Sequence, residues 1–384
     1  DNVKKKAAFK FLNHMLFLLY DSVEIRKQAE EKYGFLPPTV IVISPTMRCN
    51  LHCYGCYAGE YSKKDDLPFD IFKRVVEEAR DMGTNFVTIS GGEPFISEDV
   101  LKIWETHRDM FFVVYTNGTL IDASMAKWLS RLGNVFPCIS VEGYEQETED
   151  RRGKGTYAKI LAAMDNLLRE GVLFGFSATA TRQNNELISS EEFIDFYIEK
   201  GCFFGWYFNY IPIGRKPALE LMPTPQQRIE RLKRINRLRQ EKPILLADFW
   251  CDGPLAGGCI AGGRGYLHIN NNGDAEPCVF AHFAVDNVME KSLLEILTSP
   301  LFRAIRSRQP YSQNLLRPCM IIDEPSVLRE VVAEEAAHPT HPGAETIITE
   351  LAPAIDRYAD EYAGVADPLW AEQYQAAEVK PLRV

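Results

Sequence analysis

From residue 39 to about residue 240, short apolar runs alternate with amphipathic stretches. The apolar runs are rich in β-branched and aromatic residues, which is typical of buried strands. They fall at 39–44, 86–90, 111–115, 136–141, 173–181 and 203–211. Helical periodicity follows them near 69–82, 98–108, 122–132, 157–170, 189–200 and 224–240. Six strand–helix units in succession predict parallel strands with right-handed crossovers, and so an α/β fold, a partial (β/α)6 TIM-like barrel.

The segments on either side of this region follow different patterns. Residues 1–38 are expected to form an N-terminal helical segment, which Gly34 and the prolines after it end. Its apolar patch, 15–20, has two interpretations: a helix packed on the barrel, or a surface that meets lipid or a partner. Membrane contact through this helix is the second interpretation and is not the expected one.

Beyond the predicted barrel, glycines crowd between residues 253 and 265. A hairpin with a turn at 270–273 and a helix near 291–307 follow. We therefore expect the barrel to occupy 39–240, a small C-terminal hairpin/helix domain to occupy 241–325, and an acidic helical tail to occupy 326–384.

Composition narrows the function classes. The 384 residues are 46% hydrophobic and 25% charged, which is ordinary for a globular enzyme, and no apolar run approaches the roughly 20 residues that span a bilayer. A net charge of −10 argues against a nucleic-acid partner, because such partners require a basic face. Nine cysteines without an export signal indicate a reducing compartment, the cytoplasm, and metal ligation rather than disulfides.

The chemistry is expected where strands end, because loops at the carboxyl ends of parallel strands build the active sites of barrels. Cys49, Cys53 and Cys56 follow the first strand. Three soft thiolates converging on one loop suit an iron–sulfur cluster, and they are one ligand short of a closed site. The alternative, a structural zinc knuckle, leaves the neighbouring strand ends unexplained.

Those strand ends carry polar and glycine residues. Ser90-Gly91-Gly92-Glu93-Pro94 ends the second strand, Asn117-Gly118 the third, and Ser140 with Glu142 the fourth. Together with the cysteine spacing, these residues resemble the signature of the radical S-adenosylmethionine (SAM) superfamily. The resemblance covers 39 to about 215 and takes in Arg152-Gly153 and Pro212-Ile213-Gly214-Arg215.

The resemblance implies a [4Fe–4S] cluster whose open iron binds SAM. One electron would cleave SAM to methionine and a 5′-deoxyadenosyl radical, which would abstract hydrogen from a substrate. The implied cofactor-binding residues are Tyr54, Tyr57, Ser90, Gly91, Gly92, Glu93, Asn117, Ser140 and Glu142, with Glu93 on the SAM ammonium and Glu142 on its ribose. Either tyrosine would contact the adenine, because Gly55 replaces the aromatic residue usual in this family. No catalytic residue is assigned beyond the cluster.

A second cysteine set resembles the auxiliary-cluster domains called SPASM and twitch. Thirteen residues separate Cys259 from Gly273, and four more separate that glycine from Cys278. Adding Cys251 and Cys319 would supply four thiolates for one auxiliary [4Fe–4S] cluster. If Cys251 is not a ligand, one iron would be open to substrate or to another side chain.

The substrate stays open at this stage. The resemblance implies a peptide or protein side chain, or a natural-product or cofactor intermediate; a lipid, an isoprenoid or a tetrapyrrole is the alternative. It also implies a flavodoxin- or ferredoxin-type electron donor. A non-enzyme alternative, an iron–sulfur electron-transfer protein, would explain two clusters but not the glycine–glutamate loop or the Ser140 and Glu142 pair.

Overall fold

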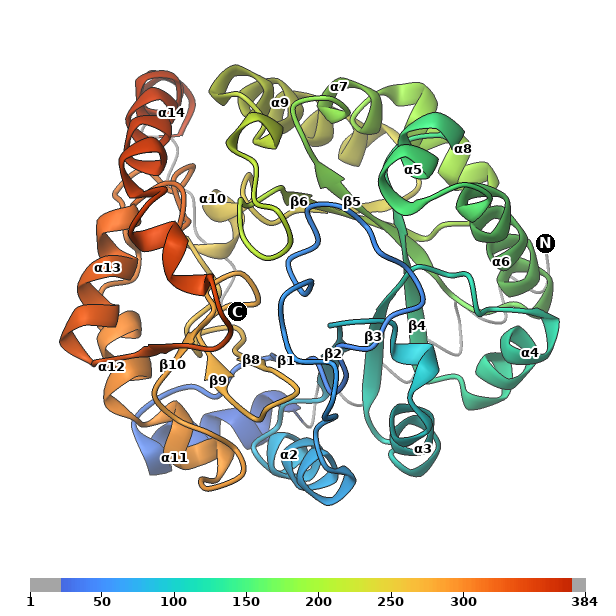
Figure 1. Ribbon diagram of the computed structural model, residues 1–384, viewed down its shortest axis with the longest axis horizontal. Coiled ribbons are helices and arrows are strands. Elements are labelled where there is room, and N and C mark those ends of the chain that lie inside the picture. The colour runs from blue at the N-terminus through green and yellow to red at the C-terminus, as the bar shows by residue number, and fades with distance from the viewer. Residues whose placement is uncertain (1–21, 375–384) are drawn as a thin grey trace.

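The computed structural model describes residues 22–374 and places a parallel sheet at the centre of the molecule (Figure 1). Each strand pairs in parallel with the one before it along the chain. These strands are β1 (Val40–Ile43), β2 (Phe86–Ile89), β3 (Phe111–Thr116), β4 (Val135–Val141), β5 (Gly175–Ala180), β6 (Phe204–Asn209) and β7 (Leu245–Asp248). The predicted α/β fold with a partial barrel is confirmed.

Helices cover the outer face of this sheet (Figure 1). Capping residues define several of their ends: Ser97 accepts a hydrogen bond from the Val100 N–H, and Thr224 forms a capping box with Gln227. The barrel helices are α2 (Phe69–Asp81), α3 (Glu98–Thr106), α4 (Ala123–Leu132), α5 (Glu145–Arg152), α6 (Thr156–Glu170), α7 (Asn185–Ile188), α8 (Glu191–Glu199) and α9 (Pro225–Glu241), with the 3₁₀ turns η1 (Pro94–Ile96) and η2 (Leu219–Leu221). The six predicted helices correspond to α2, α3, α4, α6, α8 and α9.

The sheet extends further than the six predicted strands. β7 is a seventh parallel strand, and it lies within 241–325, the range predicted for the C-terminal domain. Its pattern is weak in sequence because Asp248 is a charged residue within four positions. The Arg231 Nε donates to the Asp248 Oδ2 at 2.6 Å, and both side chains are fully buried, so the charge that disguises the strand is compensated by α9.

The sheet also continues on its other side into the predicted hairpin. β8 (His268–Ile269) pairs in parallel with β1, and β9 (Ala275–Glu276) pairs antiparallel with β8. The sheet therefore runs β7-β6-β5-β4-β3-β2-β1-β8-β9. Because β8 adds directly to β1, the two cysteine-bearing regions are held by the same sheet.

The remaining elements lie beside the barrel, yellow to red in Figure 1. The helix predicted near 291–307 is two helices, α11 (Leu293–Leu297) and α12 (Pro300–Ser307), because Pro300 begins a new helix. The other elements are α10 (Gly253–Ala256), β10 (Phe283–Ala284), α13 (Pro325–Glu334), β11 (His338–Pro339), η3 (Ala344–Ile348) and α14 (Ala352–Gln373). β11 pairs antiparallel with β10, so the proline-rich stretch at 338–343 carries a strand.

The N-terminal prediction is covered in part. Residues 22–33 are helical, and the apolar patch at 15–20 lies outside the described residues. Within 22–374, no helix is long and apolar enough to cross a membrane.

Candidate active site

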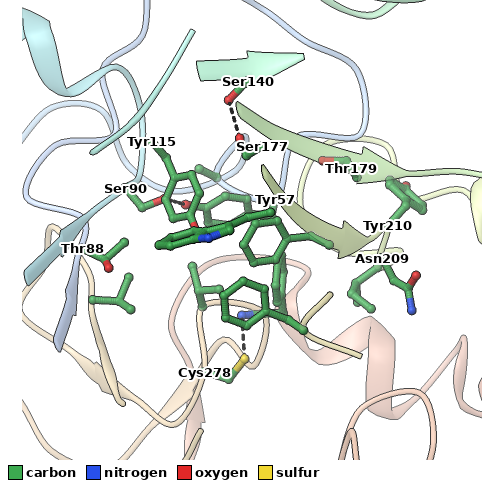
Figure 2. Close-up of a pocket in the computed structure, with 18 of the residues that line it drawn as sticks. Tyr57, Thr88, Ser90, Tyr115, Ser140, Ser177, Thr179, Asn209, Tyr210 and Cys278 are labelled. Atoms are coloured by element: carbon green, nitrogen blue, oxygen red, sulfur yellow. Dashed lines mark hydrogen bonds between the residues drawn. The ribbon is translucent and has the colours of Figure 1, made fainter. Parts of the chain in front are cut away.

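One cavity of about 460 Å³ opens at the carboxyl ends of the barrel strands. Three predicted cysteines from each set line it: Cys49, Cys53 and Cys56 on one hand, and Cys259, Cys278 and Cys319 on the other. Figure 2 shows Ser90, Ser140 and Tyr57 around this space, with Cys278 on the opposite side from Ser140. The fold therefore joins two sites that are about 200 residues apart in sequence.

The first cysteine loop is fixed by hydrogen bonds to neighbouring segments. The Arg215 backbone N–H donates to the Cys56 carbonyl at 3.0 Å, and the Arg215 Nη1 donates to the Cys53 carbonyl at 3.1 Å. Arg215 belongs to the Pro212–Arg215 stretch in the resemblance and also lines the cavity. Arg215 thus orients the cysteine loop through the backbone carbonyls of that loop rather than through its sulfur atoms.

The glycine loop after β2 is held by the cysteine loop. The Gly91 N–H donates to the Tyr57 hydroxyl at 3.0 Å, the Gly92 N–H to the Thr46 carbonyl at 2.9 Å, and the Glu93 N–H to the Arg48 carbonyl at 2.8 Å. A Cβ on Gly92 would lie 2.1 Å from the Arg48 carbonyl oxygen, so only glycine permits this approach. Gly91 and Gly92 both line the cavity.

A buried polar chain ties the first cysteine loop to the β8–β9 hairpin. The Tyr61 hydroxyl donates to the Glu276 Oε1 at 2.6 Å, and the Glu276 Oε2 lies 2.6 Å from the His268 Nδ1. The His268 Nε2 lies 2.7 Å from the Ser44 Oγ at the end of β1. Because buried polar groups must be paired, this chain fixes the hairpin relative to the loop.

The sulfur atoms of both sets receive backbone donors in a repeated geometry. The N–H of the residue two positions later points at the Sγ of Cys49 at 3.5 Å, and at the Sγ of Cys259, Cys278 and Cys319 at 3.4 Å each. Such donors favour a thiolate over a thiol. Burial opposes this effect and raises the pKa of Cys259 to about 12, and a cation bound at the sulfur would favour its thiolate.

These sulfurs fit a cluster better than a single ion. In the described residues, no three His, Cys, Asp or Glu side chains converge on one ion site. A cluster does not require that convergence, because each thiolate binds a different iron.

The structure does not bring Cys251 together with the other three auxiliary cysteines. Its side chain packs in an apolar cluster with Leu316 and Tyr362 and is not among the residues that line the cavity. Its Sγ lies 3.8 Å from the Arg228 carbonyl and donates to it, so this cysteine is held as a thiol.

Glu93 lies behind the glycine loop rather than in the cavity. It is fully buried, and its carboxylate accepts from the Thr116 hydroxyl at 2.7 Å and from the Asn117 N–H at 2.8 Å. Burial raises the pKa of Glu93 to about 7, although these donors act in the opposite direction. In this position the carboxylate anchors the end of β3 to the glycine loop.

Glu142 is likewise turned away from the cavity, toward two arginines. Its carboxylate accepts from the Arg151 Nη1 at 2.7 Å and from the Arg152 Nε at 3.0 Å. Both arginines line the cavity, whereas Glu142 does not. Two guanidinium groups against one carboxylate leave a net positive charge, and Arg152 is near enough to Cys53 and Cys56 to interact electrostatically with them.

The remaining predicted cofactor residues divide into those that line the cavity and one that does not. Tyr57, Ser90, Asn117 and Ser140 line the cavity, whereas Tyr54 is 38% exposed on the surface and does not. An unpredicted ring, Tyr210, lies beside the cysteine loop instead: a Cβ on Gly55 would lie 2.8 Å from it. Sequence reasoning missed Tyr210, because only the fold brings the end of β6 over Gly55.

Models of two families match the chain. The radical SAM superfamily model matches residues 43–187, and an iron–sulfur cluster-binding domain model matches residues 259–320. The first stretch contains the first cysteine set and the strand-end residues, and the second contains Cys259, Cys278 and Cys319.

Individual relatives match the chain at low sequence identity and over only part of its length. Fe-coproporphyrin III synthase of Methanosarcina barkeri is 29% identical over 56% of this chain, and the chain matches only 57% of that protein's length. AdoMet-dependent heme synthase of the same organism is 26% identical over 70% of this chain and 85% of the relative. The mycofactocin maturase MftC of Mycolicibacterium smegmatis is 28% identical over 72% and 74%.

A solved structure supports the fold alone. Streptococcus suis SuiB bound to S-adenosylmethionine aligns with a TM-score of 0.64 and 22% identity, over 77% of this chain and 75% of SuiB. The predicted α/β barrel with a C-terminal addition thus has an experimental counterpart.

Proposed function

Because the chain belongs to the radical SAM superfamily and carries an iron–sulfur cluster-binding domain, we propose that the cavity between its two cysteine sets is the active site of a radical SAM enzyme that modifies a tetrapyrrole. Its cofactors are SAM and two [4Fe–4S] clusters. A cluster bound by the first cysteine set would supply the electron for cleavage of SAM to methionine and a 5′-deoxyadenosyl radical, and that radical would take a hydrogen atom from the substrate. The non-enzyme alternative does not account for this family membership.

The residues are assigned by their places in the cavity. Cys49, Cys53 and Cys56 would hold the SAM-binding cluster, and Cys259, Cys278 and Cys319 the auxiliary one. Three thiolates would leave one auxiliary iron open to a further ligand. The four-thiolate set would require Cys251 to leave its apolar cluster.

SAM carries a carboxylate, and the two arginines that share Glu142 leave one positive charge beside the cysteine loop for it. Arg152, paired with Glu142 and close to Cys53 and Cys56, is the residue we assign to this carboxylate. Glu142 holds that guanidinium in place, which replaces the predicted contact between Glu142 and the ribose. Gly91 and Gly92 bring backbone, rather than side chains, to the methionyl end.

The observation that carries the substrate class is a continuous wall of aromatic rings. Phe208 stacks on Phe249 with centroids 4.7 Å apart and an interplanar angle of 11°. Trp206 meets Phe249 edge-on at 5.8 Å, and Phe280 lies 5.6 Å from Trp250. All five line the cavity. A large conjugated ring gains both apolar burial and ring stacking against such a wall, and several relatives are named for heme or porphyrin synthesis.

A peptide substrate is the second candidate. MftC, a mycofactocin maturase, matches this chain over about as much of its length as the heme synthases do. SuiB, which has the same fold, has been solved bound to its precursor peptide SuiA. The lipid alternative rested on the apolar patch at 15–20, outside the described residues. A flavodoxin- or ferredoxin-type donor stays a prediction.

Formation of 5′-deoxyadenosine by the reconstituted, reduced protein tests both candidates. An iron coproporphyrin should stimulate it above the slow rate without substrate, and Phe208→Ala should reduce that stimulation. Trp370→Phe, on α14 and away from the cavity, is the matched control. Stimulation by a peptide but not by any tetrapyrrole would overturn the first candidate and support the second.

A further inference from the structure

The auxiliary cysteines differ in one respect that the sequence does not show. Each receives a backbone N–H from the residue two positions later, at the same 3.4 Å. Cys278 receives a side-chain partner as well: the Tyr266 hydroxyl lies 2.9 Å from its Sγ. Among the described residues, no side-chain hydroxyl bonds the Sγ of Cys259 or Cys319.

Two backbone hydrogen bonds hold Tyr266 in the position that brings its hydroxyl close to the Cys278 sulfur. Tyr266 directly precedes Leu267 and β8, and its backbone N–H donates to the Ile260 carbonyl at 2.9 Å. Its own carbonyl accepts from the Gly263 N–H at 2.9 Å. Both backbone groups of Tyr266 are therefore hydrogen-bonded within the loop that follows Cys259. Tyr266 also lines the cavity.

The direction of the hydrogen bond follows from the chemistry of the sulfur. A thiolate bound to iron has no proton and can only accept. A tyrosine hydroxyl is protonated near neutral pH and can donate. The pair therefore has Tyr266 as donor and Cys278 as acceptor whenever a cluster is bound.

A donor to a cluster thiolate withdraws electron density from the iron and stabilises the reduced, more negative cluster. We propose that Tyr266 donates a hydrogen bond to the Cys278 thiolate and raises the reduction potential of the auxiliary cluster. This inference rests on the proposed function, because it requires the auxiliary cluster at Cys259, Cys278 and Cys319. A raised potential suits a cluster that accepts an electron from the substrate side of the cavity.

The test is a potentiometric titration of the anaerobically reconstituted holoprotein, followed by electron paramagnetic resonance. Tyr266→Phe should shift the auxiliary potential downward and leave the SAM-binding cluster unchanged. A variant with Cys49, Cys53 and Cys56 replaced by Ala identifies the auxiliary signal. An unchanged auxiliary potential in Tyr266→Phe, with all iron retained, overturns the inference.

Tyr311→Phe is the matched control. Tyr311 lies near the same three auxiliary cysteines, but its hydroxyl accepts from the Gln309 Nε2 at 3.2 Å. Its removal should leave both potentials unchanged, and an equal shift would attribute the effect to general polarity rather than to the hydrogen bond. If Tyr266→Phe loses iron, Tyr266→3-fluorotyrosine decides: a more acidic hydroxyl donates more strongly and should shift the potential upward, and no upward shift rejects the proposal.

Iron analysis separates this inference from the proposed function. If Cys278→Ala retains every iron, the auxiliary site itself is misplaced and the proposed function fails. If that variant loses the auxiliary irons while Tyr266→Phe leaves the potential unchanged, only the present inference fails.

Discussion

Tyr57→Phe removes a side-chain hydroxyl that joins the cysteine loop to the glycine loop. The hydroxyl lies 2.6 Å from the Ser90 Oγ and accepts from the Gly91 N–H at 3.0 Å. The other two amides of the glycine loop keep their carbonyl partners, Thr46 and Arg48. The variant therefore removes two of these four hydrogen bonds and leaves the other two to hold the loop.

The size of the effect follows from these contacts. A net hydrogen bond contributes about 1 kcal/mol, and a donor left unsatisfied costs about 1–3 kcal/mol. If about 1.4 kcal/mol of this loss falls on the SAM-bound state, the Kd for SAM rises about tenfold. The free energy of unfolding should fall by about 1–3 kcal/mol as well.

Equilibrium binding of SAM to the anaerobic, cluster-loaded protein measures the expected rise in Kd. Iron content must match the wild type, because Tyr57 follows Cys56 directly. Tyr54→Phe is the control: it removes a hydroxyl from the same loop at an exposed position outside the cavity. The reasoning is refuted if Tyr57→Phe binds SAM as tightly as the wild type, or if Tyr54→Phe weakens binding equally.

Three further predictions concern buried groups. Iron analysis should give about eight irons per chain, unchanged in Cys251→Ala but about four in Cys278→Ala; equal losses in both would restore the four-thiolate set. Glu142→Gln should lower the free energy of unfolding by about 3–5 kcal/mol, because it leaves two largely buried guanidinium groups without a counter-charge, and unaltered denaturation would contradict that pairing. The folded-state pKa of Glu93, about 7, is above the ordinary value of 4.5 for a glutamate, so its contribution to stability is present below pH 4.5 and is lost as pH rises toward 7. Melting temperatures of wild type and Glu93→Gln across this range should show a steeper decline in the wild type, and parallel profiles would reject the shift.

Much of the fold could be read from periodicity, because each barrel strand and helix is a local pattern with its own start and stop signals. The six predicted strands and helices all have counterparts in the structure. β7 was missed because its Asp248 breaks the apolar run and is compensated only by Arg231, from another element. α5 was missed because its eight residues, Glu145–Arg152, form almost no apolar face. Its two arginines instead pair with Glu142 and line the cavity.

The site could be predicted only as far as residue type and spacing reach. Cys49, Cys53 and Cys56 lie within eight residues, so their proximity is a property of the chain itself. The rule that parallel strands end at one edge of a sheet predicts that three strand-end residues lie together: Ser90, Asn117 and Ser140. Orientation is a different matter: Glu93 and Glu142 are at the expected positions, yet their carboxylates face protein donors rather than the cavity.

By itself, the sequence determined the alternation of strands and helices, the cysteine spacings and the glycine loop, because these depend on neighbours along the chain. Only the tertiary structure decided which distant groups meet. Cys251 is eight residues from Cys259, yet packs against Leu316 and Tyr362 from far later in the chain. Tyr266 reaches Cys278 because the hairpin folds back beside the loop that follows Cys259. Side-chain direction depends on packing from every neighbouring element, and no spacing along one segment contains that information.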